Sequence, residues 1–265
     1  MRRWLDMMAN RQLMRHVAVD AAMHGLATVA DRLPSMQRRQ ATFRLIEAIP
    51  YAHHAGETLC LDVLQPKVPG PHPVLIYFHG GGFAIGSKCT HRALAAAYAA
   101  QGYLVCNVDY RLAPKHPFPA ALEDACAAWL WATDQVAHYG GDSRCMTLAG
   151  ESAGANLALS VTLADPLCVL EAMATAPDLP PLFIAAGLAD PVAGDSQRLE
   201  QVLRRLRLPH TARYYPGETH AFHVMFWRAQ ALVCWRDSFE FLRRQAHPHL
   251  TDHPTHRESE PHAPG

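Results

Sequence analysis

The sequence predicts an α/β domain whose mostly parallel sheet is covered by helices on both faces. From Val74 onward, short apolar, β-prone runs alternate with longer runs of helical periodicity. Such alternation is typical of parallel strands joined by helical crossovers. Two glycine motifs each follow a predicted strand, Gly-Gly-Gly at 80–82 and Gly-x-Ser-x-Gly at 150–154. Glycines at strand ends are the second indication, because loops that face a ligand gather at one edge of a parallel sheet.

Composition favours one domain that acts on a small molecule. The chain has 265 residues, 49% of them hydrophobic, which is enough for a single core. Its 24 lysines and arginines balance 24 aspartates and glutamates, so we expect no nucleic-acid partner. The seven cysteines form no CxxC pair and indicate reduced thiols. With neither a signal-peptide pattern nor a run long enough to span a membrane, a cytoplasmic location is expected.

The elements before residue 70 differ from those that follow. Apolar residues recur at helical intervals over residues 1–39, which predicts one or two amphipathic helices. Runs at 43–49 and 58–64 predict two strands, with 54–57 as the hairpin connection. We therefore divide the chain into an N-terminal helical cap segment at 1–40 and a catalytic domain at 41–246.

The remaining elements follow in alternation. Strands are predicted at 74–78, 103–108, 146–149, 182–186 and 212–215, and helices at 90–101, 120–139, from 153, and 196–207. Residues 247–265 are polar, rich in proline and without periodicity, so a disordered tail is expected. Its five histidines lack a rigid frame, and we expect no functional metal site there.

Ser152 is the predicted nucleophile. It lies where the strand at 146–149 turns sharply into a helix, and the flanking glycines give that turn the space it needs. The N–H groups of Gly80, Gly81 and Ala153 can donate to the oxyanion that forms as the serine attacks. A phosphate cradle is the alternative, but no GxGxxG or GxxxxGK[ST] pattern accompanies the glycines.

A serine nucleophile needs a base, and the base needs an orienting acid. In this architecture they follow the serine in the order acid, then histidine. Asp190 and His220 each follow a late predicted strand. Their rivals are His223, where a helix is expected to have begun, and Asp195, which is expected to cap the helix at 196.

Arg111 lies between the two glycine motifs in the sequence, at the end of the strand at 103–108. It could pair with Glu151 or Asp109 and brace the nucleophile turn. That role would be structural.

These motifs together resemble the hormone-sensitive-lipase-like esterases, the bacterial family IV group. The resemblance runs from about Pro73 to Phe241 and rests on five motifs: HGGGF at 79–83, YRLAPKHPFPAA at 110–121, GESAG at 150–154, the late Asp-Pro at 190–191 and HAF at 220–222. It implies an alpha/beta-hydrolase fold and a cap built partly from N-terminal helices. It also implies hydrolysis of short- to medium-chain esters, without a cofactor or a metal.

The resemblance assigns roles to particular residues. It implies a triad of Ser152, Asp190 and His220, and an oxyanion hole of Gly80, Gly81 and Ala153. We expect the substrate to contact His79, Gly82 and Phe83. The expected partners are an ester substrate and, in a homodimer, a second copy of the chain.

One spacing departs from that family. Ser152 and Asp190 are only 38 residues apart, and the 17 residues of 164–180 cannot hold both a strand and a crossover helix. We hypothesise that one central strand is missing and that the strand at 182–186 pairs directly with the strand at 146–149.

Three alternatives stay open from the sequence. The same apparatus could cleave an amide, such as an arylformamide, or a lactone. The shortened segment could instead belong to a noncatalytic ligand-binding protein with a hydrolase fold. The N-terminal helices could form a membrane-surface anchor rather than a cap.

Overall fold

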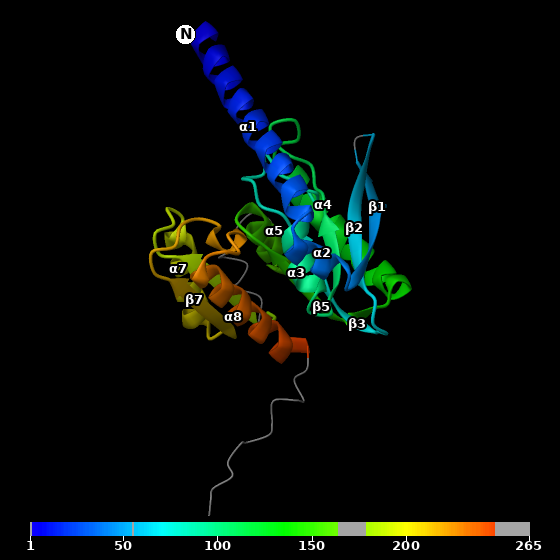
Figure 1. Cartoon of the computed structure of the whole chain (residues 1–265). Helices are drawn as coiled ribbons and strands as arrows, with labels where there is room; N and C mark the ends of the chain where they lie inside the picture. Colours follow the sequence, from blue (N-terminus) through cyan, green and yellow to red (C-terminus); the bar gives the residue numbers. More distant parts are fainter. Residues whose placement is uncertain (1, 55, 164–178, 247–265) are drawn as a thin grey trace, which may run out of the picture.

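A computed structural model describes residues 2–54, 56–163 and 179–246 of the chain. Figure 1 shows helices packed around a central sheet, with the long first helix running out beyond the rest of the fold. The segment 164–178 and the predicted tail at 247–265 lie outside the described residues.

A five-stranded mixed sheet forms the centre of the molecule, in the order β1-β2-β4-β3-β5. β4 pairs antiparallel with β2 and parallel with β3, and β3 pairs parallel with β5. The predicted hairpin is present, since β1 and β2 pair antiparallel. The strands are β1 (Phe43–His54), β2 (Glu57–Pro66), β3 (His72–Phe78), β4 (Leu104–Val108) and β5 (Gly141–Gly150).

Helices cover both faces of this sheet, as predicted. Side chains of a strand alternate between faces, and β3 shows it: Ile76 joins one core and Leu75 the other. α4 (Ala120–Gln135) and α5 (Ala153–Leu163) supply buried residues to the core that contains Ile76. α2 (Pro34–Gln40), α3 (Arg92–Ala99) and α8 (Ala229–Ala246) supply those of the second core.

β6 (Leu182–Gly187) and β7 (His210–Tyr215) form a separate two-stranded parallel sheet. The predicted direct pairing between the strands at 146–149 and 182–186 is therefore wrong: β5 pairs with β3, and β6 pairs with β7. No described strand lies between them. The hypothesis of a missing central strand stays a prediction, because it depends on the segment outside the described residues.

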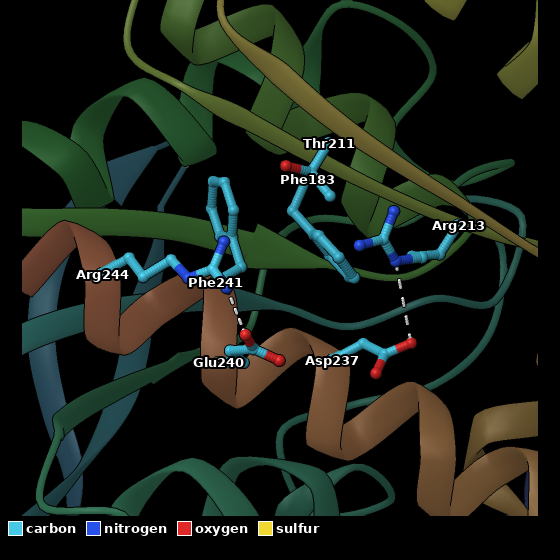
Figure 2. A pocket seen from close by; sticks show the side chains of 7 residues that line it. All are labelled: Phe183, Thr211, Arg213, Asp237, Glu240, Phe241 and Arg244. Atoms are coloured by element: carbon cyan, nitrogen blue, oxygen red, sulfur yellow. Dashed lines mark hydrogen bonds and ion pairs between the residues drawn. The ribbon is translucent and has the colours of Figure 1, made fainter. Parts of the chain in front are cut away.

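α8 packs against one face of the β6–β7 sheet. Figure 2 shows Phe183 of β6 and Phe241 of α8 side by side, with ring centroids 5.4 Å apart. Arg213 approaches Asp237 to 3.9 Å across the same interface. The cavity that remains has a volume of about 40 Å³, far below the several hundred Å³ typical of a ligand pocket.

Two helices precede the sheet, as predicted for residues 1–39. α1 (Arg2–Asp31) meets the loop after the glycine run, where Asp20 accepts a hydrogen bond from the backbone N–H of Gly86 at 2.9 Å. Over the described residues, no helix is both long and apolar enough to cross a bilayer. The cap at 1–40 and the other domain boundaries stay predictions.

Two local expectations are wrong. α7 (Ala193–Leu206) begins before Asp195, which lies in its first turn and pairs with Arg198 instead of capping the helix. The expected pairing of Arg111 is also replaced. Its guanidinium binds both carboxylate oxygens of Asp124, a buried residue of α4, at 2.7–3.0 Å. The planar guanidinium of Arg111 can donate to both oxygens of one carboxylate at once, which makes this a strong and directional pair.

Candidate active site

Ser152 lies at a strained turn between β5 and α5. Its φ of +53° is in the left-handed region, which costs a residue with a side chain free energy and often marks a functional site. The turn needs glycine on both sides: a Cβ at Gly154 would lie 2.0 Å from the carbonyl oxygen of Phe78, and one at Gly150 would lie 2.4 Å from Gly154. The serine side chain is left exposed beyond the end of β5.

Asp190 and His220 follow the ends of β6 and β7, and backbone contacts hold their two loops together. The N–H of Ala189 donates to the carbonyl of Glu218 at 2.9 Å. Gly187 makes this approach feasible, because a Cβ there would lie 2.2 Å from the same carbonyl oxygen. Since β6 and β7 are parallel and in register at Gly187 and Tyr215, both loops leave at the same edge.

The three predicted side chains form one hydrogen-bonded chain. His220 Nε2 lies 3.0 Å from Ser152 Oγ, and its Nδ1 lies 2.8 Å from Asp190 Oδ2. Because a carboxylate only accepts, the Nδ1 proton donates to Asp190, which leaves Nε2 free to accept from the serine hydroxyl. The other carboxylate oxygen of Asp190 accepts from the N–H of Val192 at 2.9 Å and so fixes the carboxylate plane.

The rival residues lie elsewhere. The ring of His223 packs edge-on to Trp235, with ring centroids 6.1 Å apart, and burial lowers its pKa. Asp195 is exposed and paired with Arg198. The geometry therefore brings His220 and Asp190, not their rivals, to Ser152.

Glu151, which the sequence analysis considered only as a partner for Arg111, links the nucleophile turn to the glycine run. Its carboxylate accepts from the N–H of Gly80 at 2.5 Å, from His91 Nε2 at 3.0 Å, and from the hydroxyl of Tyr77. Burial raises the pKa of this carboxyl, but the hydrogen bond and charge of His91, with the Tyr77 hydroxyl, outweigh it and lower the pKa below its ordinary value. An ionised, buried Glu151 therefore anchors the loop.

This contact changes the expected set of oxyanion donors. Gly80 is buried and its N–H is already bound by Glu151, so the structure does not support Gly80 as a donor. The N–H groups of Gly81 and Ala153 make no hydrogen bond to any residue that the structure describes. Gly82 follows at the exposed tip of the loop with φ +60°.

The residues expected to contact substrate lie at different depths. His79 is 1% exposed and stacks between the rings of His91 and Tyr110, so it supports the glycine loop from beneath and has no surface for a substrate. Phe83 is half-buried, and its carbonyl accepts from the N–H of Ala113. Only Gly82 and Phe83 remain accessible from the expected set.

Metal ligands do not gather near this site or elsewhere in the described ranges, where no cluster of three or more histidine, cysteine and carboxylate side chains could hold an ion. The six described cysteines are free, and Cys89 and Cys126 among them are exposed. The histidines of the predicted tail lie outside the described residues.

Comparison with known proteins supports the fold. A family model described as alpha/beta hydrolase fold matches residues 75–165. The chain therefore has the fold of the α/β-hydrolase class. Within that class, the resemblance to the hormone-sensitive-lipase-like esterases of family IV is confirmed.

Among curated relatives, carboxylesterase NlhH of Mycobacterium tuberculosis is 44% identical over 93 residues, which are 35% of this chain and 29% of that protein. Carboxylic ester hydrolase LipN of the same species is 33% identical over 168 residues, covering 57% and 43% of the two chains. The chain therefore matches less than half the length of these relatives.

Solved structures extend the similarity of fold to most of the chain. A hyperthermophilic esterase from the archaeon Pyrobaculum calidifontis has a TM-score of 0.73 at 21% identity, covering 90% of this chain and 98% of that one. A thermostable carboxylesterase from a metagenomic library also reaches 0.73, at 22% identity, and covers 88% and 97%.

Proposed function

We propose that the protein hydrolyses carboxylic esters of short to medium acyl chain length through an acyl-enzyme on Ser152. The observation that carries the proposal is the hydrogen-bonded chain from Asp190 through His220 to Ser152, with contacts of 2.8 and 3.0 Å. These lengths are those of a nucleophile within reach of its base and a base within reach of its orienting acid.

The proposed reaction has two halves. Ser152 Oγ forms a bond to the ester carbonyl carbon while its proton passes to His220 Nε2, and the free N–H groups of Gly81 and Ala153 stabilise the oxyanion, with Gly82 as a further donor. The carbon–oxygen bond to the alcohol then breaks, and His220 returns the proton to the leaving oxygen. Water repeats the sequence on the acyl-enzyme, which releases the carboxylic acid and free Ser152.

Asp190 has an orienting role in this scheme. Its carboxylate keeps the His220 proton on Nδ1 and stabilises the imidazolium that forms during each half-reaction. The α1 helix, which contacts the loop after the glycine run through Asp20 and Gly86, is proposed as part of the cap over the acyl pocket. A homodimer stays a prediction.

Covalent labelling tests the proposal. A fluorophosphonate should add once per chain, and an intact-mass measurement should show this adduct lost in Ser152→Ala. The same variant should lose hydrolysis of a p-nitrophenyl ester series. Ser143→Ala is the matched control, because Ser143 is exposed on the same strand at its opposite end. Folded protein that takes no label would contradict the proposal and favour a noncatalytic binding protein.

A further inference from the structure

A groove separate from the candidate active site runs between α3 and α8. Its volume is about 340 Å³, within the range of small-molecule sites. Ala97 and Ala100 form one wall, at the end of α3, and Leu232, Trp235 and Phe239 of α8 form the other. Most of this lining is apolar, so the groove suits a hydrocarbon group.

Three arginines surround the apolar floor, and no described aspartate or glutamate lines it. Arg39 and Arg243 have no carboxylate within ion-pair distance among the described residues, while Arg236 lies 3.3 Å from Asp237. The guanidinium of Arg39 lies 5.0 Å above the ring of Phe226, and burial without a carboxylate partner lowers its pKa. The groove therefore carries uncompensated positive charge.

The shape favours a linear occupant. The lining residues of α8 recur at helical spacing from Leu232 to Arg243, so they form one stripe along the helix. The eleven steps of the helical rise from Leu232 to Arg243 give this stripe a length of about 16 Å. A narrow apolar stripe with cations beside it complements an extended alkyl chain that ends in an anion.

We propose that this groove binds the anion of a medium-chain fatty acid, with the carboxylate against Arg39 and Arg243 and the alkyl chain along α8. Guanidinium groups form strong, directional hydrogen bonds with carboxylates. The site goes beyond the proposed hydrolysis, because none of its lining residues belongs to the triad or the glycine loop.

The groove also touches the segment that carries His220. Phe226 stacks on Trp235 with ring centroids 5.7 Å apart, and Trp235 Nε1 donates to the carbonyl oxygen of His223 at 3.0 Å. An occupant that packs against these two rings would thus contact Phe226, six positions beyond His220, and would be linked to His223 through Trp235.

Calorimetric titration of the full chain with sodium decanoate tests the site. The protein carries Ser152→Ala throughout, so that binding is measured without turnover and independently of the hydrolysis proposed above. We expect one decanoate per chain, and at least about tenfold weaker binding in R39A/R243A. Decyltrimethylammonium, with the same tail and the opposite charge, should not bind.

The matched control is R38A/R244A, which removes two charges from the same two helices outside the groove; Arg244 there pairs with Glu240. It should bind decanoate within about twofold of the parent. Equal affinities of the two double variants, or binding of decyltrimethylammonium, would overturn the proposal. If circular dichroism shows R39A/R243A unfolded, Ala100→Phe, which fills the groove, should abolish binding, and retained binding would equally overturn it.

Discussion

The carboxylate of Glu151 accepts hydrogen bonds from three parts of the fold. The donors are Tyr77 of β3, Gly80 of the glycine loop and His91, the residue before α3. Each partner contributes a donor, so an ionised carboxylate is the group that satisfies all three at once. This side chain therefore positions the loop whose next residue, Gly81, has an N–H without a hydrogen-bond partner among the described residues.

Glu151→Gln should lower kcat about 10- to 100-fold while KM changes little. The amide has one acceptor oxygen in place of two, so the glycine loop loses part of its anchor and the oxyanion donors shift. Steady-state kinetics on p-nitrophenyl butyrate measure both constants. Glu47→Gln, at an exposed residue of β1, is the control, and a rise in KM at constant kcat would contradict this role.

Asp190→Asn should lower kcat by about 10²- to 10⁴-fold with the fold intact. An amide can donate to Nδ1 and so favours the wrong imidazole tautomer, as in other serine hydrolases. Asp195→Asn, five residues on, should leave kcat near that of the parent, because Asp195 contacts Arg198 and not His220. Comparable losses in both variants would show that the region matters only for folding.

Much of this candidate site could be predicted from the sequence, because each residue of the proposed triad follows a strand and the glycines mark sharp turns. The network around Glu151 could not be predicted. Its three partners come from β3, the glycine loop and the residue before α3, and only the folded chain brings them together. The sequence offered one sign of this network, because Glu151 is a charged residue between an apolar strand and a helix that begins with small residues.

At the scale of elements, the strand, turn and helix that carry Ser152 depend on glycine at two positions. Gly154 lies against the carbonyl of Phe78, with no space for a methyl group. Gly25, in the middle of α1, has no heavy atom within 4 Å of an added Cβ. Substitution by alanine at these two positions is therefore expected to change the free energy of unfolding in opposite directions.

Gly154→Ala should lower the free energy of unfolding by about 1–3 kcal/mol, because the added methyl group overlaps the backbone of β3. Gly25→Ala should instead raise it by up to about 1 kcal/mol, since alanine favours a helix interior. Urea denaturation followed by circular dichroism gives both values. A neutral Gly154→Ala would mean that the turn relaxes easily.

Strand positions were predictable because apolar runs and turn residues are local signals, but strand pairing was not. The length of the Ser152 to Asp190 connection suggested that β6 would move beside β5, whereas among the described strands β6 pairs with β7 and not with β5. The length of a connection excludes some strand pairings, but it does not determine which of the remaining pairings forms. The hydrogen-bonded chain from Asp190 through His220 to Ser152 still forms, because the loops after β6 and β7 extend to Ser152.

At the scale of the whole molecule, the buried side chain of His79 makes folding stability sensitive to acid. His79 is almost fully buried between two rings, and burial lowers its pKa from 6.5 to about 4. As the pH falls below 6.5, the unfolded chain takes up a proton that the folded chain does not. Folding stability from this residue is therefore lost between about pH 6.5 and pH 4.

The free energy of unfolding should fall by up to about 3 kcal/mol over that pH range on account of His79. His79→Gln should make the decline shallower, although the variant starts from a lower stability because it loses two ring contacts. Urea midpoints at intervals between pH 7 and pH 4 measure the slope. His138→Gln, at an exposed residue, should keep the parental slope, and an unchanged slope in His79→Gln would contradict the assignment.

In the proposed mechanism, the exposure of Ser152 and His220 would affect what happens after an acyl group is attached to the serine. On the proposed acyl-enzyme, no described segment would have to open before bulk solvent reached the ester bond on Ser152, and His220 beside it could activate any hydroxyl compound that arrived. The covalent intermediate would be short-lived in water. In solutions rich in small alcohols, the same openness would divert acyl groups into new esters.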